Sequence, residues 1–395
     1  MGAARCGHVF NPPRLVWRLH VDLCPSAGRR LTQHITLFAG LHWRKEHKIS
    51  ERRKLAFRRA LTRLPSWVVR IILTGRRRRM RGRVMDPKAQ AMAEYIQLVR
   101  RPGVFPTPAE SRQQLAGLIE AFESPAPSLA RKENFTIPGP VSEIPVRLYA
   151  PKSGQDRVLP VLVYFHGGGW VQGDLDTHDT LCVKLSRGAG CLVVAVDYRL
   201  APEHQFPAAV DDCMAAYSWI CQNTVELGGD PHHVAIAGDS AGGNLAAVVS
   251  QQAMPSGMHL PVAQLLIYPA LDFSFETESF EEMPDAFVIP RERMEWFRGH
   301  YLPNSADISD PKASPLRAQD LSGQPATMVV TGGFDPLRSE GKAYADRLMH
   351  AGVPVTYREF EGQIHLFVCV TRVISQGDIC IDEMTKFLKE QFISA

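Results

Sequence analysis

Three residues that lie far apart in this sequence, Ser240, Asp335 and His365, have the side chains needed to turn a hydroxyl group into a nucleophile. A serine hydroxyl attacks an acyl carbon poorly at neutral pH unless a histidine takes its proton, and a carboxylate holds that histidine in the right tautomer. Each of the three residues follows a short apolar run that predicts a buried strand. Because the carboxyl ends of parallel strands meet at one edge of a sheet, we expect these side chains to lie together there.

Ser240 is the centre of a Gly-x-Ser-x-Gly pattern, Gly238–Gly242. The apolar run Val234–Ala237 before it predicts a strand, and the small and apolar residues after Leu245 predict a buried helix. A strand that turns sharply into a helix holds the serine in a strained backbone, and glycines on both sides leave room for that turn. A glycine-rich turn without a catalytic role is the alternative interpretation of the pattern when it is taken alone.

A second glycine-rich segment, His166–Trp170, follows the predicted strand Val161–Tyr164. Consecutive glycines let backbone N–H groups turn toward one point, where they can stabilise the negative oxygen of a tetrahedral intermediate. We expect the N–H groups of Gly167, Gly168 and Ala241 to form this oxyanion hole. The alternative is a flexible turn.

Asp335 and His365 come just after two further predicted strands, Thr327–Thr331 and Val355–Phe360. Taken singly, an Asp-Pro pair is commonly a turn and a lone histidine is commonly structural. The chain order serine, aspartate, histidine is that of the α/β-hydrolases, and the other folds with such a triad use different orders. The combination therefore predicts acyl transfer through an acyl-enzyme, with His365 as the base.

From about Met85 to its C-terminus, the sequence resembles the hormone-sensitive-lipase-like group of α/β-hydrolases, the bacterial family IV esterases. The resemblance rests on these segments: His166–Trp170, Asp197–Glu203, Phe206–Asp212, Gly238–Gly243, Asp335–Leu337 and His365. It implies a serine carboxylesterase for short- to medium-chain acyl esters and a homodimer. Lipase or amidase activity on the same triad is one alternative, and a non-catalytic homologue that binds a small molecule is another. Leu366 stands where the family usually has glycine, which predicts a narrower pocket beside His365.

Strand and helix patterns alternate through the body of the chain, which predicts an α/β fold with a mostly parallel central sheet and helices on both faces. Strands are predicted at 134–137, 146–149, 158–165, 192–198, 234–237, 265–267, 327–331 and 355–360. Helices are predicted at 88–99, 108–122, 177–187, 207–222, 341–351 and 379–392.

Two segments are expected to form a small helical cap over the site, as the resemblance implies: residues from about 86 to 125 and from about 273 to 318. The second segment carries an apolar set suited to an acyl or aromatic group. We expect Phe287 and Val288 from this segment, together with Trp170 and Leu366, to contact the substrate. The alternative for most apolar residues of the segment is packing between cap and body.

The first 84 residues differ from the rest in charge. They contain 21 Lys and Arg against 3 Asp and Glu, so their net charge of +18 contrasts with −14 for 85–395. Phe57, Leu61, Leu64, Val68 and Ile72 fall at helical spacing among basic residues, which indicates a basic amphipathic pattern interrupted by Pro65. We expect residues 1–84 to be an extension outside the hydrolase domain of 85–395, either a leader preceding a start at Met85 or a weak membrane-surface contact. A nucleic-acid arm is the least supported interpretation, because basic and aromatic residues are not interleaved.

Other patterns narrow the functional class. The eight cysteines form no Cys-x-x-Cys pair, which favours buried thiols in a reducing compartment. The chain contains no apolar run of 18 residues and no recognisable secretory signal, so a cytoplasmic location is expected. It also contains no dinucleotide or P-loop fingerprint and no metal-ligand spacing, so we expect neither cofactor nor metal. The expected partner is a small-molecule ester.

Overall fold

The computed structural model describes residues 51–100, 103–152 and 158–394, which lie in a compact unit that spans Ile49–Ala395. At its centre is an eight-stranded sheet with the strand order β10-β9-β8-β7-β5-β6-β4-β3. Strands β5 to β10 run parallel to one another, whereas β4 is antiparallel to both of its neighbours, β3 and β6. The strands are β3 Arg131–Ile137, β4 Ile144–Ala150, β5 Leu159–Phe165, β6 Leu192–Val196, β7 Gly229–Asp239, β8 Ala263–Ile267, β9 Ala326–Phe334 and β10 Val355–Ile364.

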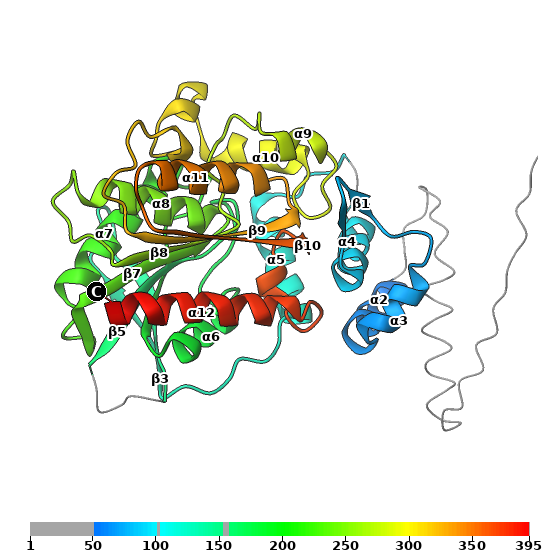
Figure 1. Cartoon of the computed structure of the whole chain (residues 1–395), viewed down its shortest axis with the longest axis horizontal. Helices are drawn as coiled ribbons and strands as arrows, with labels where there is room; N and C mark the ends of the chain where they lie inside the picture. The colour runs from blue at the N-terminus through cyan, green and yellow to red at the C-terminus, as the bar shows by residue number, and fades with distance from the viewer. Residues whose placement is uncertain (1–50, 101–102, 153–157, 395) are drawn as a thin grey trace, which may run out of the picture. The chain divides into compact units, whose positions relative to one another are not determined.

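Helices cover both faces of the sheet (Figure 1). Helices α7, α8 and α11 lie on one face, and α6 and α12 lie on the other. Their bounds are α6 Asp179–Ala189, α7 Ala208–Gln222, α8 Ala241–Ala253, α11 Arg338–His350 and α12 Gln376–Ser394. Every residue of β6 and β8 is buried, as expected for parallel strands covered on both sides. The predicted α/β-hydrolase architecture is confirmed.

The two segments expected to form the cap fold as short helices. The first contains α4, Pro87–Val99, and α5, Pro108–Phe122. Each begins where its sequence supplies a cap, because the side chains of Asp86 and Thr107 accept backbone N–H groups of the first turn and a proline follows each. The second segment contains α9, Glu278–Glu282, and α10, Arg291–Tyr301.

Residues 51–84 pack into the same compact unit, whereas the charge pattern predicted an extension reaching residue 84. They form α2, Glu51–Arg63, α3, Ser66–Ile72, and a hairpin of β1, Arg79–Met80, with β2, Arg83–Val84. The apolar side of the predicted amphipathic helix is buried: Phe57, Leu61, Leu64 and Val68 are all at most 5% exposed. The Lys88 ammonium of α4 donates to the Leu61 carbonyl, which ties these helices to the cap. Residues 1–50, with Cys6 and Cys24, lie outside the described residues.

The six cysteines within the described ranges are free thiols, and all but Cys221 are buried, as predicted. Among the helices that the structure describes, none is both long and apolar enough to cross a membrane.

Candidate active site

Ser240 lies at a tight turn between β7 and α8. Its backbone has φ 53° and ψ −116°, a conformation that non-glycine residues rarely adopt. The glycines around it are required sterically, since a Cβ on Gly238 would lie 2.2 Å from the Gly242 carbonyl oxygen. A Cβ on Gly242 would lie 2.0 Å from the carbonyl oxygen of Phe165. The turn therefore presents Ser240 at the carboxyl edge of the sheet with the first turn of α8 beneath it.

The three candidate catalytic side chains meet at this edge. Oγ of Ser240 lies 3.0 Å from Nε2 of His365, and Nδ1 of His365 lies 2.7 Å from Oδ2 of Asp335. Asp335 follows β9 and is fully buried, and its Oδ1 accepts the Leu337 N–H at 2.9 Å. His365 follows β10 and is 5% exposed. This geometry allows the imidazole to accept the serine proton while the carboxylate fixes the ring.

The predicted oxyanion donors need one correction. The Gly167 N–H donates to Oδ1 of Asp239 at 2.7 Å, so it is already used inside the protein. The N–H groups of Gly168, Gly169 and Ala241 have no acceptor among the described residues. Gly168 and Gly169 have φ angles of 125° and 61°, which residues with a side chain rarely adopt. Gly169, and not Gly167, is therefore the second available donor of the loop.

Asp239, next to the nucleophile, is the buried anchor of this loop. Its carboxylate is 1% exposed, accepts the Tyr164 hydroxyl and the Gly167 N–H at 2.7 Å each, and forms an ion pair with Nε2 of His178 at 3.3 Å. Burial disfavours the charged forms of both His178 and Asp239, but the attraction between their opposite charges outweighs this effect. The pKa of His178 is therefore raised and that of Asp239 is lowered.

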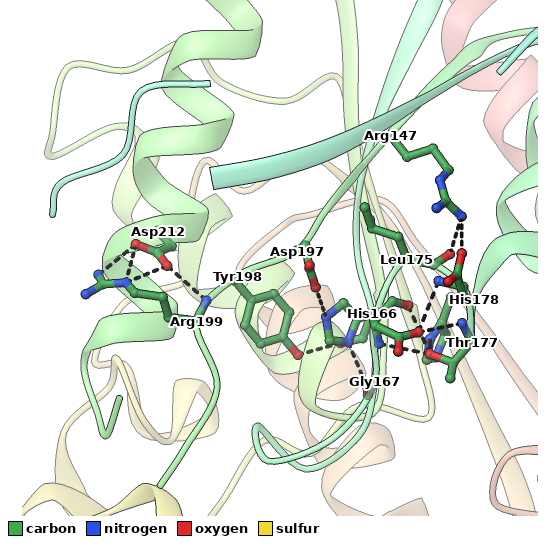
Figure 2. Close-up of polar contacts among 12 residues, drawn as sticks. Arg147, His166, Gly167, Leu175, Thr177, His178, Asp197, Tyr198, Arg199 and Asp212 are labelled. Carbon is green, nitrogen blue, oxygen red and sulfur yellow. Dashed lines mark hydrogen bonds and ion pairs between the residues drawn. The ribbon is translucent and has the colours of Figure 1, made fainter. Parts of the chain in front are cut away.

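His166 is held differently from its neighbour His178 (Figure 2). Its ring stacks on Tyr198 with centroids 4.4 Å apart, and its carbonyl accepts the Tyr198 hydroxyl at 2.7 Å. Burial, together with the charge on His178, lowers the pKa of His166 to about 4. The two histidines thus lie side by side behind the glycine loop with pKa values shifted in opposite directions, and neither contacts Ser240 in the described structure.

Ser240 and His365 open into a cavity of about 650 Å³. Its walls come from α4, α5, α10, the glycine loop and the segment after β10. Trp170, Val288 and Leu366 line it, as predicted, and the Trp170 ring stacks on Tyr301 at 4.7 Å. Phe287 does not line it, because its ring lies under the guanidinium of Arg78 instead.

Leu366 has φ 73°, in the left-handed region that favours glycine. Glycine would adopt this backbone conformation after His365 without strain, whereas leucine adopts it at a cost in conformational free energy. Its half-buried side chain occupies part of the cavity wall next to His365 and Ser240. The narrowing of the pocket beside His365 stays a prediction.

One group of described side chains has ligand atoms close enough to consider a metal: His178, Asp239 and Cys369 lie within 4.8 Å of one another. The Asp239 carboxylate already accepts two hydrogen bonds and forms an ion pair with His178. Burial raises the pKa of the Cys369 thiol well above its usual range, which keeps it protonated. This group is better explained as the support of the glycine loop than as a metal centre.

Comparisons with known proteins agree with this geometry. Residues 162–369 match a family model described as the alpha/beta hydrolase fold. The chain is 40% identical to carboxylic ester hydrolase LipN of Mycobacterium tuberculosis over 314 residues, which is 77% of this chain and 82% of LipN. It is 44% identical to carboxylesterase NlhH of the same species over 238 residues, 59% of this chain and 74% of NlhH.

Solved structures give the same result. The structure of the ester-hydrolase EH1AB1 from the metagenome of Lake Arreo matches with a TM-score of 0.75 and 40% identity, covering 78% of this chain and 99% of that one. The thermostable carboxylesterase EstE1 from a metagenomic library matches with a TM-score of 0.69 and 40% identity, covering 73% and 98%. By sequence and by fold, the chain belongs to the α/β-hydrolase family, in its hormone-sensitive-lipase-like group of ester hydrolases.

Proposed function

We propose that this protein is a serine carboxylesterase that hydrolyses short- to medium-chain acyl esters through an acyl-enzyme on Ser240. The observation that carries the proposal is the continuous chain of contacts from Ser240 through His365 to Asp335, which opens on a cavity. The identity to curated ester hydrolases supports the same chemistry.

In the proposed mechanism, His365 takes the proton of Ser240 while the serine oxygen attacks the acyl carbon. The carbonyl oxygen becomes negative and accepts hydrogen bonds from the free N–H groups of Gly168, Gly169 and Ala241. Each such donor lowers the activation barrier by roughly 3 kcal/mol. The same histidine then protonates the departing alcohol. Water, deprotonated by His365, attacks the acyl-enzyme, and the carboxylic acid leaves.

The shape of the cavity favours acyl chains of limited length. Its volume of about 650 Å³ has to hold both the acyl and the alcohol part of the ester. Leu366, Trp170 and Phe297 line the cavity together with Ser240. The placement of His365 against Ser240 also favours an enzyme over a non-catalytic binding homologue.

The test is hydrolysis of p-nitrophenyl esters from acetate to palmitate by the wild type and by Ser240→Ala. We expect a maximum at short or medium chains and loss of activity in the variant. A maximum at palmitate would replace the proposal with a lipase. Activity that persists in Ser240→Ala would remove the serine from its role, and hydrolysis of amides alone would make the protein an amidase.

Two further predictions concern association. A homodimer through the sheet edge at β10 would have to accommodate residues 83–86, because Arg83 pairs with Glu359 and the Asp86 N–H donates to the Gly362 carbonyl at 2.8 Å. A weak membrane-surface contact would use exposed residues of α3, such as Trp67, which is 62% exposed, since the apolar side of this segment is buried. Light scattering after gel filtration and vesicle co-sedimentation test these two predictions.

A further inference from the structure

Two arginine side chains, Arg100 and Arg293, line the same cavity as Ser240 and His365. Arg100 directly follows α4 in the first cap segment, and Arg293 lies in the first turn of α10 in the second. Both side chains are half-buried. A cavity that only had to hold an uncharged acyl chain would not need two guanidinium groups in its wall.

Neither guanidinium is neutralised within the described part of the chain. No carboxylate there lies within 4.0 Å of Arg100 or of Arg293. Three carboxylates, Glu110, Asp239 and Glu292, line the cavity as well, and that of Asp239 pairs with His178. The Glu110 carboxylate caps α5 through the Thr107 N–H at 2.8 Å, and Glu292 is exposed to solvent.

The two positive charges also act on each other. Burial is the main cause that lowers the pKa of both groups, to about 10 for Arg293. The nearby charge of Arg100 lowers the pKa of Arg293 further, whereas Glu292 partly offsets the shift of Arg100. Burying two like charges close together costs free energy that a bound anion would recover.

The protein holds both side chains in place while leaving donors available. Arg100 donates through Nη2 to the Val288 carbonyl at 2.5 Å. Arg293 donates through Nη2 to the Ser111 hydroxyl, which is fully buried and donates in turn to Gln172. The remaining nitrogens of both guanidinium groups have no acceptor among the described residues and are not sealed from solvent.

Arg293 is linked directly to the proposed oxyanion loop. Its Cζ lies 4.7 Å from the centroid of the Phe297 ring and 4.2 Å from that of Trp296. The same Phe297 ring packs against Gly169, where a Cβ would lie 2.5 Å from it. One aromatic ring therefore touches both the oxyanion loop and the guanidinium, and Arg293 lines the same cavity as Ser240.

We propose that Arg100 and Arg293 form a subsite for an anionic group, best matched by a carboxylate, that the ester substrate carries away from its scissile bond. Guanidinium groups bind carboxylates through paired, charge-assisted hydrogen bonds, and both residues line the cavity. The substrate class is then a half-ester of a dicarboxylic acid or an ester of similar charge. This inference rests on the proposed esterase function and specifies its substrate.

The experiment compares monomethyl adipate and monomethyl glutarate with their dimethyl esters, which have similar length and no charge. The measured quantity is the ratio of kcat/KM for the half-ester to that for the diester, obtained from methanol release. We expect Arg293→Met and Arg100→Met each to lower this ratio by about 10- to 100-fold. Arg187→Met is the matched control, because it removes one exposed positive charge from α6 far along the chain from the cap.

Because the ratio is taken within one variant, a change in folding or in Ser240 chemistry cancels. Arg293→Lys keeps the charge but loses the paired donors, and we expect a ratio between those of the wild type and Arg293→Met. Free adipate should inhibit diester hydrolysis competitively in the wild type and more weakly in both Met variants. A ratio unchanged in both Met variants, or a wild type that rejects half-esters while hydrolysing diesters, would overturn the anion subsite. Failure to hydrolyse any ester would instead count against the esterase proposal.

Discussion

Replacing Asp239 by asparagine should weaken both the fold and the reaction, although Asp239 does not belong to the Ser–His–Asp chain. The substitution keeps the size and one oxygen of the side chain but removes its charge. The Gly167 N–H and the Tyr164 hydroxyl, each 2.7 Å away, would then bind a neutral acceptor, and the ion pair with His178 at 3.3 Å would be lost.

The expected cost follows from these three contacts. A hydrogen bond to a charged group contributes about 1 kcal/mol more than a neutral one, so two such bonds account for about 2 kcal/mol. Loss of the ion pair adds about 1 kcal/mol, because a buried His178 loses the partner charge that favours its protonated form. Asp239→Asn should therefore unfold with a free energy lower by about 3 kcal/mol.

The pH dependence gives this prediction a signature. The raised pKa of His178 contributes stability below about pH 6.5 that is lost as the pH rises through its folded value. The lowered pKa of Asp239 contributes stability above about pH 4 that is lost as the pH falls through its own folded value. The difference between wild type and Asp239→Asn should be largest between about pH 4 and 6.5 and should shrink on either side.

Two assays and one control check this prediction. Urea unfolding at several pH values gives the free energies, and p-nitrophenyl butyrate hydrolysis gives kcat, which should fall about 10- to 100-fold because Gly167 no longer fixes the oxyanion loop. Tyr164→Phe removes only one bond to Asp239 and should cost about 1 kcal/mol without the pH signature. An Asp239→Asn variant with unchanged kcat and a pH-independent loss of stability would refute the reasoning.

The remaining predictions concern the loop, the pocket and a buried acid. Gly169→Ala should lower kcat at least 100-fold, since its Cβ would strike the Phe297 ring at 2.5 Å, whereas Gly299→Ala in α10 meets nothing within 4 Å and should keep wild-type kcat. Leu366→Gly should relieve about 1 kcal/mol of strain at φ 73° and move the optimum of a p-nitrophenyl ester series to longer acyl chains; an unmoved optimum would contradict the role of Leu366. Burial raises the pKa of Glu340 well above its usual range, so its contribution to stability falls as pH rises above about 4.5. Glu340→Gln should therefore be more stable than wild type by about 1 kcal/mol at pH 8, and this difference should vanish near pH 4. Thermal unfolding at both pH values measures it.

Much of the fold could be predicted because it depends on local patterns. The period of apolar residues gave the parallel strands, and the glycines around Ser240 indicated the sharp turn before α8. Ser240, Asp335 and His365 were predictable as a group because each follows a strand whose carboxyl end reaches the same edge.

Features that depend on contacts between distant segments could not be predicted from these patterns. Gly167 was expected to donate to the oxyanion, but its N–H donates to Asp239, whose carboxylate also pairs with His178 of a different segment. Phe287 was expected in the pocket because it is apolar, yet Arg78 from the basic N-terminal segment covers its ring. A local sequence pattern shows whether a side chain is apolar or charged, but not which distant residue contacts it in the folded chain.

The N-terminal segment illustrates the same limit. Its positive charge led to the prediction that residues up to 84 are separate from the hydrolase domain. Phe57 and Leu61 are instead buried where their helix meets α4, and the sequence pattern of α4 does not indicate this contact. The arginines of the cavity are a further case, because basic residues on separate cap helices come together only in the folded chain.

The most direct test of the central claim is covalent trapping of the nucleophile. A small phosphonate ester that mimics the tetrahedral intermediate is mixed with the wild type, and intact mass and peptide mapping are followed together with p-nitrophenyl butyrate activity. We predict one adduct per chain, on Ser240, with activity lost in proportion to labelling, and no adduct in Ser240→Ala. Activity that survives complete labelling of Ser240, or inactivation with the adduct on another residue, would contradict it.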